Sequence, residues 1–426
     1  MNTSANVELL LLLLVVTLVV ALIVRRVQWP YTLALVIVGL GLGFWHIFPT
    51  VQLAPDAVLF LFLPALLFEG AINIDLKRLK ADWFAVFLLA VPGLLLAIGI
   101  AAAFLHWGMG IDWLTALLLG AIISPTDPVS VLALFRQLGL PERLRTIIEG
   151  ESLFNDGVGA AIFATLLTIV LAQGHPSVGW HIGLNAVWLM VGGPLIGVAV
   201  AFGVARLVQR QRIDDHLLET SITISVAYGV YILSELAHTS GLLAVIGAGI
   251  VLRNVRRASG TATTTLDAIH DFWEILGYLA NSLLFLLVGI QIGAGSFVQD
   301  LPGIVWAVMG VLVGRAVLIY GLLPLQNLLA LRAAHRPHQA GHARPKHIPT
   351  RWQPILLFSG LRGALSLALV LSLPTTIPKS GVLAGIVYGV VLVTLLGQGI
   401  GLHYVLPHWK KGEVSASHNP AHPPTS

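Results

Sequence analysis

Apolar runs about as long as a bilayer is thick recur along the chain, from Val7 almost to its C-terminal end. A helix needs roughly 20 apolar residues to cross the hydrocarbon of a membrane. Only 10% of the 426 residues are charged and 57% are hydrophobic, whereas soluble domains carry about 25% charged residues. The sequence therefore predicts an all-α polytopic membrane protein without a large soluble domain.

The first apolar run, 7–24, has no basic segment before it and no small-residue cleavage site after it, so we expect a retained helix rather than a signal peptide. The chain has no cysteine, which rules out disulfides and thiolate metal sites. Its formal charge is +4, but the basic residues stand in short clusters between the apolar runs. This placement indicates membrane topology and not nucleic-acid binding.

About thirteen transmembrane helices are expected. The predicted spans are 7–24, 31–48, 53–73, 83–105, 112–138, 146–172, 180–206, 217–237, 240–253, 268–291, 302–330, 352–373 and 381–405. With loops alternating sides, one side of the membrane receives all but three of the 24 Lys and Arg: Lys379 lies opposite, and Arg315 and Arg362 lie inside spans. The positive-inside rule then puts the N-terminus outside and the C-terminus in the cytoplasm of a multi-pass cell-membrane protein.

Two spans carry an interruption near their middle. The fifth contains Ser124-Pro125-Thr126-Asp127-Pro128, where two prolines remove backbone donors. The twelfth contains Ser359-Gly360-Leu361-Arg362-Gly363, with paired glycines around a charge. The two spans are seven apart and so cross in opposite directions, which predicts inverted repeats of spans 2–6 and 9–13 with two crossed discontinuous helices. Such interruptions point to a transporter's substrate site.

Acidic residues occur where the membrane makes them costly. A charged carboxylate at a helix centre costs roughly 2.5–3.5 kcal/mol, which predicts a functional use for Asp127, Glu151 and Asp156. Ser152 and Asp156 share one face of the sixth span, and Asn155 lies beside Asp156. Together with Thr126 and nearby carbonyls they would form an all-oxygen site, and hard cations such as Na⁺ or Li⁺ prefer oxygen ligands.

Desolvation raises the proton affinity of a carboxylate, so we expect Asp156 to hold either a proton or a cation. If only this acid titrates, exchange is one for one and electroneutral. A second carboxylate in place of Asn155 could carry another charge. Asp127 would neutralise the N-terminal ends of the half-helices and Arg362 their C-terminal ends. Arg315 needs a buried counter-charge, and Glu151 is its preferred partner; Arg362 is the alternative partner of Glu151. Both arginines would compensate charge at the site.

These motifs resemble those of the cation/proton antiporter superfamily, in particular its electroneutral NhaP-like sodium/proton exchanger branch. The resemblance covers Ser124 to Asp127, Glu149 to Gly157, Gly314-Arg315 and Ser359 to Leu367. It implies a homodimer in membrane lipid, with an interface domain (1–80 and 177–300) and a core domain (81–176 and 301–406). The polar composition of 407–426, rich in Pro and His, predicts a short disordered cytoplasmic tail. The resemblance also implies ion contacts from Asp156, Ser152, Thr126 and Glu69, with Asp127, Asn155, Glu151, Arg315 and Arg362 supporting the site.

Other functions are compatible with parts of the pattern. A K⁺/H⁺ antiporter would use the same fold, a cation channel would need a continuous lined pore, and an intramembrane aspartyl hydrolase would pair Asp127 with Asp156. The sequence favours a transporter without enzymatic activity or a cofactor, and without a nucleic-acid partner. The histidines at 335–347 invite a pH-sensor interpretation, but a solvated cytoplasmic loop is favoured.

Overall fold

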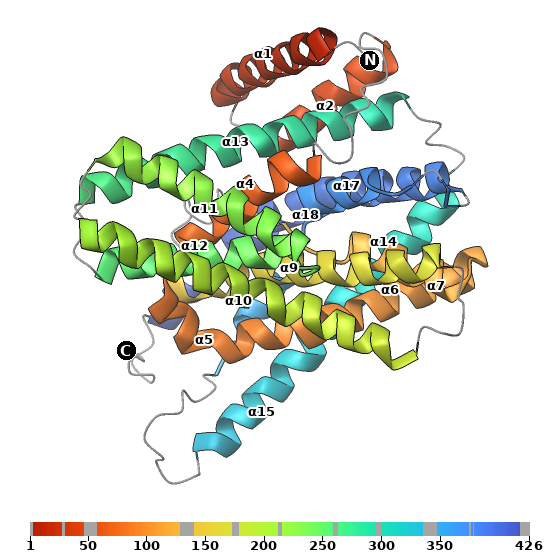
Figure 1. Cartoon of the computed structure of the whole chain (residues 1–426). Coiled ribbons are helices and arrows are strands. Elements are labelled where there is room, and N and C mark those ends of the chain that lie inside the picture. Colours follow the sequence, from red (N-terminus) through yellow and green to blue (C-terminus); the bar gives the residue numbers. More distant parts are fainter. Residues whose placement is uncertain are drawn as a thin grey trace.

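The computed structural model contains helices but no strand in the part of the chain that it describes (Figure 1). The described residues are 3–27, 30–46, 58–127, 140–172, 179–211, 215–258, 263–294, 300–334, 347–374, 376–377 and 379–417. The α-helices are α1 (Thr3–Val27), α2 (Tyr31–Phe44), α4 (Leu63–Asn73), α5 (Leu76–Leu88), α6 (Leu94–Met109), α7 (Trp113–Ile123), α9 (Glu142–Leu171), α10 (Gly179–Gln211), α11 (His216–Leu236), α12 (Gly241–Ala258), α13 (Thr263–Ala294), α14 (Leu301–Val317), α15 (Leu323–Ala334), α16 (Gln353–Phe358), α17 (Ala364–Leu371) and α18 (Ser380–Ser417).

Each predicted span overlaps at least one helix of the described chain, and the fifth and twelfth are interrupted at 124–127 and 359–363. Eight segments of the described chain are helical, long and apolar enough to cross a membrane, and shorter apolar helices cover 31–44, 60–73 and 113–123. The fourth span joins α5 and α6 through the π-helix η2 (Leu89–Gly93), and the eleventh joins α14 and α15 through η4 (Leu318–Leu322). The prediction of an all-α multi-span membrane protein is confirmed.

The C-terminal segment differs from the prediction. The tail 407–426 was expected to be disordered, but α18 continues to Ser417, and residues 418–426 lie outside the described part. A helix that has already formed propagates with one hydrogen bond for each added residue. Lys410, Lys411 and Glu413 are good helix formers, so the polar composition of this segment does not end the helix.

The packing of α6 against α14 shows that the two helices are antiparallel. A Cβ added to Gly310 would lie 2.9 Å from the Cα of Ala101, and one added to Gly314 would lie 3.3 Å from the Cα of Ala97. Residue numbers rise along α14 as they fall along α6. These helices belong to the fourth and eleventh spans, so their opposite directions agree with the predicted odd shift between them.

The close pair α2 and α13 is parallel. A Cβ on Gly39 would lie 3.0 Å from the Cα of Gly289, and one on Gly293 would lie 2.8 Å from the backbone nitrogen of Phe44. Small residues at such contacts let helices approach closely in lipid. The second and tenth spans are therefore codirectional, as an even shift requires. Both pairings support the predicted alternation of spans, while the inverted repeat stays a prediction.

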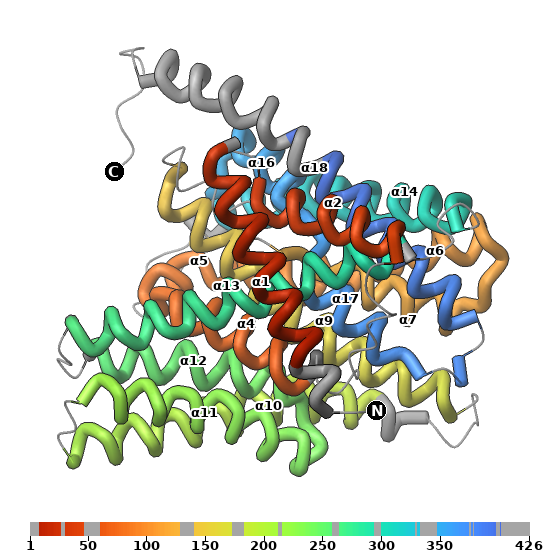
Figure 2. Tube along the Cα trace, turned by 90° about the horizontal axis from the view of Figure 1, so that it is seen from above, coloured from red at the N-terminus to blue at the C-terminus, as the bar shows by residue number. Residues whose placement is uncertain are grey.

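The helices pack in two groups; in Figure 2, α11, α12 and α13 lie at the left of the view and α6, α7 and α14 at the right. The α13 group consists of α1, α2, α4, α10, α11, α12 and α13, and the α9 group consists of α5, α6, α7, α9, α14, α16, α17 and α18. Helix α9 also contacts α10 and α12 of the other group. Residues on α9 therefore lie near the boundary between the two groups.

Candidate ion-binding site

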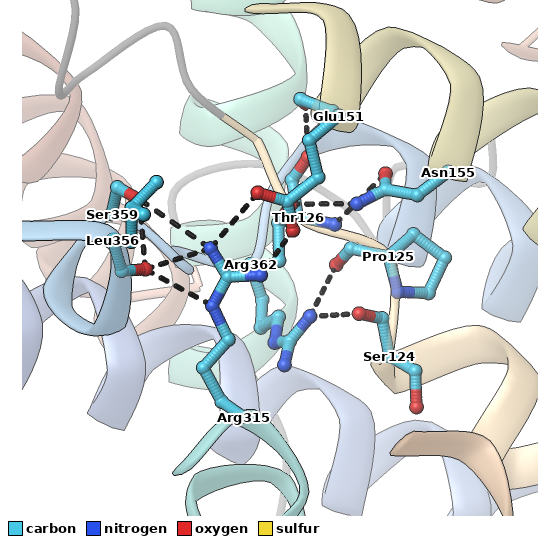
Figure 3. Close-up of polar contacts among 10 residues, drawn as sticks. Ser124, Pro125, Thr126, Glu151, Asn155, Arg315, Leu356, Ser359 and Arg362 are labelled. Carbon is cyan, nitrogen blue, oxygen red and sulfur yellow. Dashed lines mark hydrogen bonds and ion pairs between the residues drawn. The ribbon is translucent and has the colours of Figure 1, made fainter. Parts of the chain in front are cut away.

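Helix α7 ends in the middle of the fold, and an arginine from a distant segment completes its C-terminus. After Ile123 the described chain, 124–127, is not helical, as the prolines in this stretch require. The Nη1 of Arg362 donates to the carbonyl oxygen of Ser124 and, at 2.9 Å, to that of Pro125 (Figure 3). The guanidinium therefore binds carbonyls that no helical N–H can reach. Residues 128–138, the second part of the predicted fifth span, lie outside the described residues.

The second break meets the first. Residues 359–363 separate α16 from α17, and the backbone N–H of Asp127 donates to the carbonyl oxygen of Leu361 at 2.8 Å. The Asp127 carboxylate lies against Gly363, the residue before α17, where a Cβ would overlap its Oδ2 atom. An anion at this position is stabilised by the positive N-terminal end of α17. Asp127 and Arg362 thus stand at helix ends of the sign that the sequence predicts for each.

The close approach of the Asp127 carboxylate to Gly363 leads to a prediction about stability. We expect Gly363→Ala to destabilise the protein by roughly 1–3 kcal/mol, because the added methyl group must displace the Asp127 carboxylate. In the control Gly99→Ala, within α6, nothing lies within 4 Å of the added Cβ. That change should stabilise by about 0.5–1 kcal/mol through helix propensity. Thermal midpoints in detergent should therefore move in opposite directions; a Gly363→Ala midpoint equal to or above wild type contradicts the described contact.

Thr126 joins the first break to α9. The Nδ2 of Asn155 donates to the Thr126 hydroxyl at 2.8 Å, and the Thr126 N–H donates to Asn155 Oδ1 at 3.4 Å. The Ser152 hydroxyl donates to the Thr126 carbonyl oxygen. The structure therefore brings together three of the predicted oxygen donors. Asn155 already uses its amide oxygen for the Thr126 backbone, so here it ties the break to α9.

Asp156 lies one turn beyond Ser152 on the same face of α9, and its side chain is partly exposed. In the described part of the chain no hydrogen bond or ion pair joins its carboxylate to another residue. Its electrostatic neighbours are Asp127 and Arg362. The acid is thus close to one charge of each sign without being neutralised by direct contact with an arginine.

A cavity of about 670 Å³ follows the same face of α9 away from Asp156. Ala160, one turn from Asp156, lines it, together with Phe163, Ala164 and Leu167 farther along the helix. The other walls come from α10, from the turn between α11 and α12, and from α17. Polar side chains on these walls include Asn185, Glu235, His238, Ser240 and Ser372. The cavity, lined by apolar and polar side chains, therefore reaches to within one helical turn of Asp156 between the two helix groups.

Glu151 and Arg315 form a buried ion pair, with 2% and 3% of the respective residues exposed. Arg315 donates to both carboxylate oxygens, through Nη1 to Oε1 and through Nη2 to Oε2 at 3.2 Å. Its Nε and Nη2 also donate to the Leu356 carbonyl oxygen at 3.1 and 2.7 Å (Figure 3). Arg315 is therefore the partner of Glu151, as preferred from the sequence. The pair joins α9 and α14 to the C-terminal end of α16.

Glu69 occupies a different environment. Its Oε1 accepts a hydrogen bond from Asn73 Nδ2 at 2.8 Å, and its methylene carbon lies against Gly277 of α13. The neighbouring Gly70 contacts Leu153 of α9. Glu69 thus faces α13, and its contact with the ion stays a prediction. Within the described residues, no group of three or more His, Asp or Glu is arranged to hold a metal ion.

Comparisons with known proteins agree on one family. The family model described as "Sodium/hydrogen exchanger, transmembrane" matches residues 11–407. The chain is 38% identical over 379 residues to the Na(+)/H(+) antiporter ApNhaP of Aphanothece halophytica, covering 89% of this chain and 69% of that one. It is 37% identical over 411 residues to the low-affinity Na(+)/H(+) antiporter NhaS1 of Synechocystis, with 95% and 75% covered.

A solved structure shares the fold. The sodium proton antiporter MjNhaP1 from Methanocaldococcus jannaschii, determined at pH 8, superposes with a TM-score of 0.76. The match covers 96% of this chain and 99% of that one at 19% sequence identity. At this identity the likeness establishes the architecture, and the site must be argued from the contacts described above.

Proposed function

The chain belongs to the sodium/hydrogen exchanger family, and on this premise we propose that it exchanges Na⁺ or Li⁺ for H⁺, one for one, at Asp156. The family consists of transporters, so the aspartyl hydrolase considered from the sequence is set aside. The proposal assigns the transported cation to oxygens of Asp156, Ser152 and Thr126, with Glu69 as a further contact. Asp127 and Asn155 support this ion and proton site, and no cofactor takes part.

The proposal rests mainly on one observation: within the described residues the Asp156 carboxylate is not paired with an arginine. An acid paired with an arginine would be neutralised permanently and would have little tendency to bind a proton or Na⁺. Asp156 makes no such pair within the described residues, although Arg362 is close enough to interact electrostatically. Arg362 instead binds the carbonyls of Ser124 and Pro125. Asp156 is thereby left available for a transported ion.

Unpartnered polar atoms around the breaks support an ion site there. The Oγ atoms of Ser124 and Ser366 and the Nε of Arg362 are buried without a hydrogen-bond partner in the described part of the chain. Buried polar atoms of this kind are rare in folded proteins and are usually satisfied by water or a ligand. The water that a partly hydrated cation brings into the site would supply such partners.

Exchange then follows from competition at one carboxylate. With a proton bound, Asp156 is neutral; with Na⁺ bound, the carboxylate and cation together are also neutral. The loaded site therefore carries the same charge in both directions, which makes the exchange electroneutral. The proposal keeps Asp127 charged throughout, since the positive N-terminal end of α17 stabilises its carboxylate. Lower pH should raise the Na⁺ concentration needed for half-maximal rate, because protons occupy the same group.

We also propose the domain division and orientation. The α13 group corresponds to the predicted interface domain, 1–80 and 177–300, and the α9 group to the predicted core domain, 81–176 and 301–406. The chain would form a homodimer through the interface domain, with its N-terminus outside and its C-terminus in the cytoplasm. In this orientation the 670 Å³ cavity opens to the outside, since the turn between α11 and α12 lies there.

A proton-flux assay in proteoliposomes tests the proposal. With a pH dye enclosed in vesicles loaded with acid, external Na⁺ or Li⁺ should raise the internal pH, while an organic cation of similar charge should not. A response to K⁺ alone would favour the K⁺/H⁺ alternative. Imposing a membrane potential should leave the rate nearly unchanged. A current that follows the potential would contradict electroneutral exchange and favour a channel.

A further inference from the structure

A second polar cluster lies at the other end of α9, outside the ion site. Arg143, in the first turn of α9, donates from Nε to Asp82 Oδ1 at 2.8 Å, and its Nη2 lies 2.7 Å from the same oxygen. Its Nη1 donates to the carbonyl oxygen of His347 at 2.8 Å. The guanidinium carbon lies 5.6 Å from the ring centroid of Trp352. One side chain therefore contacts three segments that are far apart in the sequence.

The contact between Asp82 and Arg143 lies at a kink in α5 and is largely buried. Asp82 interrupts α5, with φ −123° and ψ 17° inside an otherwise helical stretch, and only 7% of it is exposed. A buried carboxylate is costly unless it is paired and hydrogen-bonded. Arg143 supplies that partner and is itself only 28% exposed. The kink in α5 and the start of α9 are thus joined by a largely desolvated ion pair.

The third segment leads into the discontinuous α16–α17 unit. His347 and Trp352 lie just before α16, and Ile348 between them exchanges two hydrogen bonds with the Asn327 side chain of α15, at 2.9 and 2.8 Å. The backbone that Arg143 binds is therefore held on its other side as well. Along the chain, this segment continues through α16 to the non-helical residues 359–363, which include Arg362. Arg143 fixes the start of the Asp156 helix relative to the start of the Arg362 segment.

We propose that Arg143 is a positioning residue of the ion site: its contacts with Asp82, His347 and Trp352 hold α9 in register with α16 and so set the position of Asp156 relative to Arg362. Asp156 lies thirteen positions after Arg143 along the helix, a rise of about 20 Å. A continuous helix transmits a tilt or shift at one end to the other, and displacements of about 1 Å can change the function of a site strongly. The inference rests on the proposed exchange at Asp156.

The chemistry of arginine is needed for this role. Its planar fork can serve Asp82 and the His347 carbonyl at once while its face covers Trp352. A lysine has a single ammonium group and can retain the charge pair with Asp82, but it lacks the fork and the flat face. Arg143→Lys therefore separates the charge of the residue from its function as a three-way contact.

The test compares Na⁺ dependence with stability in the same proteoliposomes. We expect Arg143→Gln to raise the KM for Na⁺ by about five- to ten-fold and to lower the thermal midpoint, because the buried Asp82 carboxylate loses its partner. In the double variant Asp82→Asn/Arg143→Gln that charge is removed, so the midpoint should recover while the KM stays high. Arg143→Lys should keep most of the stability and still raise the KM. The control is Arg145→Gln, which loses a pair with Glu149 made within α9.

Three results would contradict the proposed role of Arg143. If the KM of the double variant returns to the wild-type value along with its midpoint, Arg143 is structural only and the inference is wrong. It is also wrong if Arg143→Gln leaves the KM unchanged, or if Arg143→Lys behaves as wild type. Wild-type exchange and its loss in Asp156→Asn, measured in parallel, test the underlying function separately. If the wild type exchanges ions and Arg143→Gln has an unchanged KM for Na⁺, only the positioning role of Arg143 is contradicted, and the proposed exchange stands.

Discussion

Asp156→Asn should reduce Na⁺- and Li⁺-driven proton movement to the level of protein-free vesicles. Asparagine has nearly the same shape as aspartate but can neither take up a proton nor balance a cation, so both halves of the exchange are lost. In the described structure the Asp156 carboxylate makes no hydrogen bond or ion pair. The loss therefore cannot be ascribed to a missing structural contact, and the thermal midpoint should stay equal to or above that of the wild type.

The matched control is Asp267→Asn, which makes the same replacement of a carboxylate oxygen by an amide nitrogen at an exposed acid near the start of α13. It should transport at the wild-type rate, since surface substitutions without special contacts have small effects. Internal pH should be recorded for both variants after equal reconstitution, with Na⁺, Li⁺ and K⁺ in turn. Continued exchange by Asp156→Asn with unchanged ion dependence would remove Asp156 from the mechanism and require another carrier.

Much of this architecture follows from simple patterns in the sequence. Apolar runs of membrane-spanning length predict the helices, and the asymmetry of Lys and Arg favours an odd number of spans. Pro125 and the paired glycines at 360 and 363 predict where helices end in mid-membrane. The carboxylates and arginines stand out because so few charges occur inside the spans. Each of these signals is local or depends only on composition.

Contacts between distant segments were harder to predict from the sequence. The sequence left two candidates open for Glu151, and the structure selects Arg315 because Arg362 is occupied by the carbonyls of Ser124 and Pro125. Which free carbonyl an arginine meets depends on how two broken helices cross. The hydrogen bond between Asp127 and Leu361 fixes that crossing, and no periodicity encodes it.

Other features were missed because nothing in their local sequence marks them. The Leu356 carbonyl, which Arg315 binds, belongs to an ordinary apolar stretch. Gly363 was expected to interrupt a helix, and the structure shows that it also leaves room for the Asp127 carboxylate. Asp82 and Arg143 read as ordinary polar residues near helix starts, and only the packing of α5 on α9 makes them a buried pair.

The buried pair between α9 and α14 gives the largest expected effect on stability. Glu151→Gln leaves the Arg315 guanidinium buried at 3% exposure without its counter-charge, and breaking such a pair costs roughly 3–5 kcal/mol. For a chain of this kind the thermal midpoint in detergent should fall by on the order of 10 °C. Any exchange that survives should keep the wild-type Na⁺ dependence, since Glu151 neutralises Arg315 and not the ion.

Removing both charges distinguishes pairing from a direct role in transport. In Glu151→Gln/Arg315→Met the uncompensated charge is gone, and replacing a buried pair by apolar groups of similar volume is often neutral or stabilising. We expect the midpoint to recover in part only, because the Leu356 carbonyl oxygen also loses the two donors that Arg315 supplies. If the double variant is no more stable than Glu151→Gln alone, coupling between the two charges does not hold α9 to α14. If the double variant is stable but its Na⁺ dependence is changed, Glu151 belongs to the ion site itself, because α9 then keeps its place while the site loses a carboxylate.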